Sequence, residues 1–159
     1  GAVAFAVLLH DLGKALTAPE LLPRHLEHEA AGIVPLDALC ARLRVPNDLA
    51  ALARVVCREH LNVHRAAELR PGSMVDLLER LDAWRQPHRV AAITLACAAD
   101  KLGRAGQSLI GFDYPPRELI ARALAATLRV DAQPFLDRGL RGPEVGAALR
   151  EQRCRLLAG

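Results

Sequence analysis

An adjacent histidine and aspartate, His10 and Asp11, are the residues of this sequence best suited to chemistry. An imidazole nitrogen and a carboxylate oxygen side by side are a partial ligand set for a divalent cation such as Mn, Fe, Co, Ni or Mg. Gly13 permits a tight turn after the pair, and Lys14 adds a positive charge that suits a phosphate substrate. A capping aspartate beside a solvated histidine gives the same dipeptide, so the pair alone leaves both interpretations open.

Asp100 is the most informative acid outside this pair, because the residues that directly precede it are small or apolar. An ionised carboxylate on such a helix face is costly unless a cation or a hydrogen-bond donor meets it. One explanation is an ion pair with Lys101 or Arg104. The other is a metal ion that Asp100 shares with His10 and Asp11.

Five further histidines could bind metal or titrate near neutral pH. His25 and His28 are spaced i,i+3, so one helical face could present both, and His60 and His64 are spaced i,i+4 if one helix carries them. A surface or capping role is the alternative for each of these. For His88, which follows a proline at an expected helix start, the surface role is preferred.

The elements that must position these residues are predicted to be helices. Alanine, leucine, arginine and glutamate dominate and β-branched residues are sparse, which predicts an all-α fold, a compact helical bundle with a short helical C-terminal tail. The apolar run before His10 predicts a core helix over residues 2–12, with the His-Asp pair at its rigid end. A second helical pattern covers 25–44, bent or split by Pro35, and 62–72 is expected to be connecting chain. The other expected helices are 47–60, 73–81, 87–104, 118–128 and 144–157, with a helical turn at 131–138.

Composition bounds the class of protein. A chain of 159 residues, 52% apolar, predicts one domain with at most a short appendage. A net charge of +3 and a pI near 8.9 are compatible with nucleic acid or a phosphorylated substrate without indicating either. Aromatic residues make up only 3%, which argues against a base-stacking surface of the kind that binds single strands.

Cysteine spacing, the length of the N-terminal apolar run and the position of the only methionine give expectations about the cellular setting and about the extent of the chain. The four cysteines form no CxxC pair, and we expect free, buried thiols in a cytoplasmic protein. The apolar run that ends at Leu9 is too short to span a bilayer, and no signal peptide precedes it, so no membrane association is expected. The only methionine is Met74, so we expect this sequence to be a piece of a longer protein that continues upstream.

The string from His10 to Lys14, after an apolar helix, resembles the signature of the HD superfamily of metal-dependent phosphohydrolases. In that superfamily a histidine, the His-Asp pair and a late aspartate surround a divalent ion that activates water against a phosphoester. The resemblance implies His10, Asp11 and Asp100 as metal ligands. The first histidine of the pattern lies upstream of the apolar run and is absent here, so the metal site is expected to be incomplete.

The order of motifs along nearly the whole chain resembles the C-terminal HD domain and tail of bacterial CCA-adding enzymes, which are tRNA nucleotidyltransferases. The matching stretches are 10–17, 22–28, 40–47, the histidines at 60 and 64, 82–89, 99–106, and 139–146 followed by Arg153. The resemblance implies an HD domain over residues 1–110 and a helical, tRNA-binding tail over 111–159. No motif of the polymerase part is present, so no polymerase residue is assigned.

The resemblance also implies an activity: hydrolysis of 2′,3′-cyclic phosphodiesters, 2′-nucleotides and phosphate monoesters with Ni, Mg or Mn. The implied catalytic residues are His10, Asp11 and Lys14, and the implied substrate-pocket residues are His28, His60 and Arg104. The implied partners are tRNA or RNA 3′ ends and small cyclic or 2′-nucleotides, with homodimer formation left open. The alternative function is a non-catalytic module that positions tRNA for the polymerase part, because the chain is mildly basic and its tail carries arginines.

Overall fold

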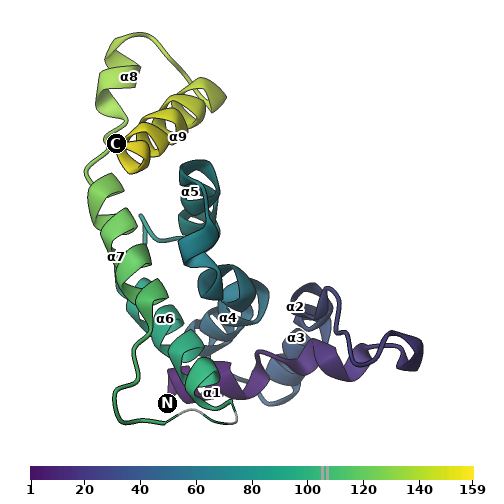
Figure 1. Cartoon of the computed structure of the whole chain (residues 1–159). Coiled ribbons are helices and arrows are strands. Elements are labelled where there is room, and N and C mark those ends of the chain that lie inside the picture. The colour runs from purple at the N-terminus through teal and green to yellow at the C-terminus, as the bar shows by residue number, and fades with distance from the viewer. Residues whose placement is uncertain (105, 107) are drawn as a thin grey trace.

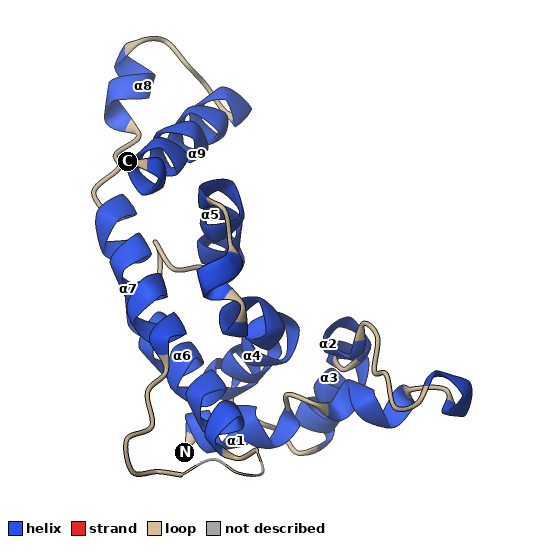
Figure 2. Cartoon of the chain, viewed as in Figure 1, coloured by secondary structure: helices blue, strands red, loops and turns tan. Residues whose placement is uncertain are grey.

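The computed structural model describes residues 1–104, 106 and 108–159, and all regular elements in these ranges are helices (Figure 2). The α-helices are α1 (Ala2–Leu9), α2 (His28–Ala31), α3 (Ile33–Arg42), α4 (Asn47–His64), α5 (Pro71–Arg80), α6 (Pro87–Leu102), α7 (Pro115–Thr127), α8 (Gln133–Asp137) and α9 (Pro143–Ala158). The 3-10 helices between them are η1 (Leu12–Leu16), η2 (Pro19–Leu21) and η3 (Ala66–Glu68). The predicted all-α fold is confirmed. Ala105, part of the 99–106 motif, lies outside the described residues.

Helix α4 is the centre of the fold and packs against α1, α2, α3, α5, α6 and α7. Its apolar face, with Leu52, Val56 and Val63, is buried in the same core cluster as Ala6 and Leu9 of α1. Removing each large apolar side chain from water contributes about 1.5–3 kcal/mol, so this cluster holds α1 firmly against α4. The segment that follows α1 therefore starts from a fixed point.

The two ends of the chain lie at different ends of the molecule (Figure 1). Helices α2 and α3 and the 3-10 segment η1 pack together at one end, and α8 and α9 form the other. Helix α7 runs from beside α6 toward α8 (Figure 1), and its Ile120, Ala123 and Leu124 belong to the common core. Helix α9 packs against α5 and α7. The functional division into 1–110 and 111–159 stays a prediction.

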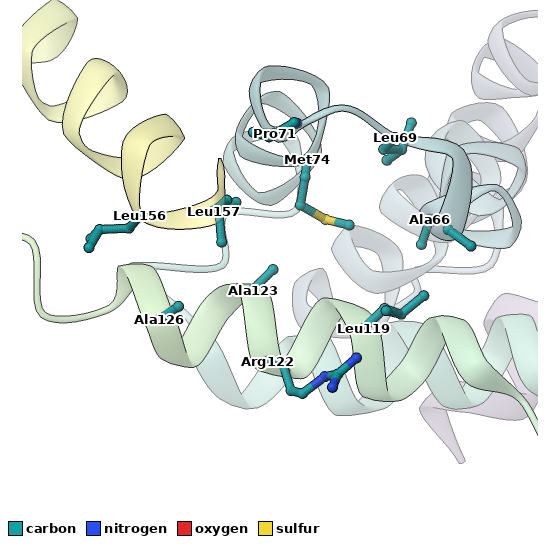
Figure 3. A pocket seen from close by; sticks show the side chains of 11 residues that line it. Ala66, Leu69, Pro71, Met74, Leu119, Arg122, Ala123, Ala126, Leu156 and Leu157 are labelled. Atoms are coloured by element: carbon teal, nitrogen blue, oxygen red, sulfur yellow. The ribbon is translucent and has the colours of Figure 1, made fainter. Parts of the chain in front are cut away.

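An apolar cavity of about 370 Å³ lies where η3, α5, α7 and α9 meet (Figure 3). Met74 of α5, Ala123 of α7 and Leu157 of α9 face one another across it, and Arg122 is the charged residue of its lining. None of its lining residues is one of the expected site residues.

The cysteines and the helices agree with two expectations from the sequence. All four cysteines are free thiols, and three are buried; these are Cys40, Cys57 and Cys97, whereas Cys154 is half-buried. Within the described residues, no helix combines the length and the apolar character that crossing a bilayer requires.

Two predicted helices differ from the structure near the His-Asp pair. The first helix ends at Leu9 instead of residue 12, and the chain tightens into η1. The pattern over 25–44 is split at Gly32, not at Pro35. Pro35 is the third residue of α3, where a backbone N–H would have no partner within the helix, so proline costs no hydrogen bond there.

The expectation of connecting chain over 62–72 is wrong for most of that stretch. Helix α4 continues to His64, and the side-chain amide of Asn62 donates to the Glu59 carboxylate at 2.9 Å within the helix. Helix α5 then begins at Pro71, two residues before Ser73, because a proline fits the first helical position. His60 and His64 therefore lie one turn apart on a single helix.

Gly13 lets η1 approach α2 more closely than any other residue would. A Cβ atom at this position would lie 1.9 Å from the carbonyl oxygen of His28 and 2.7 Å from the backbone nitrogen of Gly32. Both atoms belong to backbone that cannot swing away. The contact fixes the distance between the His-Asp pair and His28.

We expect Gly13→Ala to lower the free energy of unfolding by about 3 kcal/mol, because the methyl group must push η1 and α2 apart. Gly146→Ala is the matched control: a Cβ added to this helical glycine would meet no atom within 4 Å, and alanine favours helix by up to about 1 kcal/mol. Urea unfolding of both variants measures the difference. Equal stability of the two variants would contradict the close-packing argument.

Candidate metal centre

Three histidines from separate elements present the same ring nitrogen to one place. His10 follows α1, His28 begins α2, and His60 lies in the last turns of α4. In each ring, Nδ1–H donates to a backbone carbonyl three residues earlier, at 2.7 Å, 2.7 Å and 2.9 Å respectively. These carbonyls belong to Val7, His25 and Cys57. The bonds fix the ring orientations and turn Nε2 of each ring toward the cluster, the arrangement that metal-binding histidines use.

The Asp11 carboxylate lies among these three nitrogens. Its Oδ1 is 3.2 Å from Nε2 of His28 and 3.7 Å from Nε2 of His60, and its Oδ2 is 3.2 Å from Nε2 of His10. The His28 and His60 Nε2 atoms are 3.3 Å apart. Asp11 Oδ1 is buried, and no donor in the described residues makes a satisfactory hydrogen bond to it. Inward-facing lone pairs of this kind are a donor set for a cation.

Asp100, in the last turns of α6, brings a second carboxylate to the cluster. Its Oδ1 lies 3.3 Å from Nε2 of His10. Its Oδ2 accepts hydrogen bonds from His64 Nε2–H at 2.7 Å and from Arg104 at 3.1 Å. The oxygen that faces the cluster is therefore the one left free by these two donors.

Lys14 and Arg104 each pair with one of the two carboxylates. The Lys14 ammonium lies 2.5 Å from Asp11 Oδ2, and the Arg104 guanidinium 3.1 Å from Asp100 Oδ2. Both basic side chains are roughly half exposed, at 41% and 54%, whereas the Asp100 side chain is 14% exposed. The two explanations offered for Asp100, an ion pair and a shared metal site, are compatible. Its Oδ2 pairs with Arg104, whereas its Oδ1 faces His10.

His64 and Tyr114 complete the site. From the sequence, His64 is only one of several histidines that could bind metal, and Tyr114 is not selected. The Tyr114 hydroxyl lies 2.8 Å from Nδ1 of His64, whose Nε2 faces Asp100. Burial, followed by the nearby Cys97 and Asp100, raises the pKa of Tyr114 above its usual value, so the hydroxyl stays protonated. The i,i+4 spacing of His60 and His64 is the one available signal in the sequence, and it is lost if the helix is expected to end at residue 60.

The charge state of His10 depends on the two carboxylates. Burial lowers its pKa, but hydrogen bonds to Asp100 and Asp11 outweigh burial and raise the pKa to about 10. His60 is different: burial lowers its pKa, so the ring is neutral and its Nε2 lone pair is available.

Both carboxylates are strongly acidic. Burial alone would raise the pKa of Asp11, yet hydrogen bonds from His10 and Lys14 bring it well below its usual range. Hydrogen bonds from His10 and His64 do the same for the pKa of Asp100. Both groups are therefore ionised at neutral pH and can serve as anionic ligands.

The structure brings six of the seven residues selected from the sequence into contact through this one network, and Arg104 is joined to it through Asp100. His28 and His60 lie against Asp11, and their role in a substrate pocket stays a prediction. Ligand atoms of His10, Asp11 and His60 lie within 4.8 Å of one another. Nitrogen and carboxylate oxygen donors suit Ni²⁺ and Mn²⁺, and the carboxylates suit Mg²⁺. The donor set fits a divalent cation, and the expected incompleteness of the site stays a prediction.

Comparison with known sequences gives a consistent group of relatives. The chain is 51% identical over 156 residues to the multifunctional CCA protein of Xanthomonas euvesicatoria pv. vesicatoria (strain 85-10), which covers 98% of the chain and 38% of that protein. It is 52% identical to the same protein of Stenotrophomonas maltophilia (strain R551-3), with the same coverage. Identity to that of Halorhodospira halophila is 48% over 97% of the chain and 37% of the relative.

The chain thus spans well under half the length of the curated relatives it matches. No protein-family model matches it, and no solved structure matches it significantly. The identity extends over nearly all of its residues, so the similarity includes the elements that build the cluster as well as α7 to α9.

The raised pKa of His10 predicts how stability depends on pH when chelator removes metal. The folded chain keeps a proton on His10 up to about pH 10, whereas an unfolded histidine releases it near 6.5. Between these values the folded state binds more protons, so the free energy of unfolding falls as pH rises, by up to about 1.4 kcal/mol per pH unit. Urea unfolding in EDTA at pH 7, 8 and 9 measures this slope.

His10→Gln should flatten the slope, because it removes the titrating group. His88→Gln, at an exposed position at the start of α6, is the matched control and should keep the slope of the parent protein. A His10→Gln variant with the parental slope would show that the proton is held elsewhere.

Proposed function

This chain is a homologue of one segment of the multifunctional CCA proteins, and we propose that it is a divalent-metal-dependent phosphohydrolase domain. The observation that supports this most strongly is the convergence of three Nε2 atoms on the Asp11 carboxylate, with every Nδ1 held by a backbone carbonyl. The proposed substrates are RNA-end 2′,3′-cyclic phosphates, 2′-nucleotides and phosphate monoesters.

The proposed ligands are His10, Asp11 and Asp100, with His28 and His60 on the other side of Asp11. A divalent cation held there lowers the pKa of water and neutralises charge on phosphoryl oxygens. Nickel suits a set with this many imidazoles better than magnesium or manganese does.

Basic side chains at the edge of the site are suited to binding the phosphate of a substrate. Lys14 and Arg104 are exposed enough to meet a phosphate and carry the positive charge that its oxygens require. Each is already oriented by a carboxylate, so neither must be ordered when substrate binds. The neutral His60 ring, buried at 2% exposure, lies beside Asp11, with its Nε2 3.7 Å from Asp11 Oδ1.

The second candidate function is a non-catalytic module that positions tRNA. Residues 111–159 hold eight arginines against six acidic residues, so this third of the chain carries most of the net positive charge. A hollow of about 600 Å³ between α8 and α9 has Arg129, Arg138 and Arg155 in its lining, together with Phe135. Arginine and an aromatic ring suit a phosphate and a base, respectively.

Asp11→Asn tests the first function. The substitution keeps the shape of the side chain but removes the charge that the cation needs, so turnover of 2′,3′-cyclic AMP with Ni²⁺, Mn²⁺ or Mg²⁺ should fall roughly 100-fold or more. Asp48→Asn, an exposed position in the first turn of α4, is the control and should keep parental turnover. Unchanged turnover in Asp11→Asn would remove the assignment.

Arg129→Ala with Arg138→Ala tests the second function. If the hollow between α8 and α9 contacts tRNA, the double variant should bind tRNA several-fold more weakly in a gel shift. Its affinity should also depend less steeply on salt, because about two phosphate contacts are lost. Tight tRNA binding by the chain without substitutions, in the absence of metal-dependent turnover, would favour the tRNA-positioning module over the hydrolase.

A further inference from the structure

His60 and His64 lie one turn apart on α4, but their rings are held in opposite ways. The Nδ1–H of His60 donates to a backbone carbonyl at 2.9 Å, which leaves the lone pair on Nε2. Nε2 of His64 lies 2.7 Å from an ionised carboxylate, that of Asp100, and must therefore carry a proton. On the other side of the ring, the Tyr114 hydroxyl lies within hydrogen-bond distance of Nδ1, at 2.8 Å.

We propose that Tyr114 is a positioning residue for Asp100 and acts through His64. Its hydroxyl holds the His64 ring in the orientation from which Nε2–H donates to Asp100 Oδ2, so that Asp100 Oδ1 is presented to the cation. His64 is thus a donor to a ligand, whereas His60 is itself available as a ligand. The proposal rests on the metal site of the proposed function but concerns residues outside the ligand set.

The backbone holds Tyr114 in place for this role. Tyr114 is the residue before α7, and Pro115 at the first helical position keeps it out of the helical conformation, with φ −132° and ψ 80°. Pro116 beside it is buried. The tyrosine ring meets the His64 ring edge to face, with centroids 5.8 Å apart and planes at 89°. The hydroxyl therefore reaches Nδ1 without a flexible segment between ring and helix.

The hydrogen bonds on Asp100 explain why the orientation of the His64 ring matters. Oδ2 accepts from His64 and from Arg104, whereas Oδ1 faces His10 at 3.3 Å. Without the tyrosine hydroxyl, the His64 ring keeps no hydrogen bond at Nδ1 and can turn away from Asp100. The carboxylate would then lose one of the two donors that orient it.

Nickel affinity of the purified protein, measured by calorimetry, tests the proposal with Tyr114→Phe, His64→Ala and the double variant. Tyr114→Phe should weaken Ni²⁺ binding roughly tenfold, as expected for a partner of a ligand. In the His64→Ala background the same substitution should have no further effect, because its route to Asp100 is gone. At saturating nickel the KM for 2′,3′-cyclic AMP should stay unchanged, since Tyr114 touches no substrate.

His64→Gln is the conservative variant. Its side-chain amide can donate to Asp100 without help from a hydroxyl, so it should recover part of the affinity lost in His64→Ala, and Tyr114→Phe should add nothing to it. Trp84→Phe is the matched control: it deletes one partly buried hydrogen bond, from the indole to Thr127 at 3.0 Å, between residues outside the cluster. It should lower Tm without changing nickel affinity.

Equal nickel affinities of the parent protein and Tyr114→Phe would overturn the proposal. A tenfold loss that persists in the His64→Ala background would overturn it too, because Tyr114 would then act by another route. Nickel binding without hydrolysis would overturn the proposed function alone, and the affinity ratios would still decide the role of Tyr114. A parent protein that binds no divalent cation would overturn both.

Discussion

The hydrogen bonds from three imidazole Nδ1 atoms to backbone carbonyls are the constraint on which the site depends. Each carbonyl lies three residues before its histidine, so the direction of Nε2 is set by the local turn of backbone. A surface histidine chooses among several rotamers, whereas these rings have one orientation each. The relative positions of the three Nε2 atoms then depend only on how three short stretches of backbone are placed relative to one another.

That placement comes from packing that has nothing polar in it. Helix α1 is held against α4 by buried apolar side chains, and His10 follows directly from its last turn. The 3-10 segment that follows approaches α2 at the backbone distance that Gly13 permits, and this brings His28 to Asp11. Asp100 lies near the end of α6, which packs against both α1 and α4. The apolar core thus fixes the positions of the helices, and the helices fix the positions of the polar side chains in the cluster.

The sequence predicted the site residues whose adjacent residues in the chain mark them as unusual. It missed the contacts between residues that lie far apart in the chain. An apolar run before His10 and small residues before Asp100 mark both as polar groups in apolar surroundings, and helix-forming composition predicts the fold class. The break at Gly32 instead of Pro35 depends on a backbone contact with η1, which no local pattern contains. The link from Tyr114 to His64 spans 50 residues, and that from His64 to Asp100 spans 36, so only the packed structure could reveal it.

Lys14 and Arg104 show why a basic residue near a metal site has more than one role. The sequence assigned Lys14 to a phosphate, and Arg104 both to an ion pair with Asp100 and to the substrate pocket. In the structure each pairs with a carboxylate of the cluster. Two carboxylates so close together repel each other, and a cation on the outer oxygen of each reduces that repulsion while leaving the inner oxygen free. The same two side chains extend to the exposed edge of the cluster, where a phosphate would arrive. The positive charges of Lys14 and Arg104 stabilise the two carboxylates before substrate binds, and they are already positioned for a phosphate. This is one physical reason for a lysine three residues after Asp11 and an arginine one turn after Asp100.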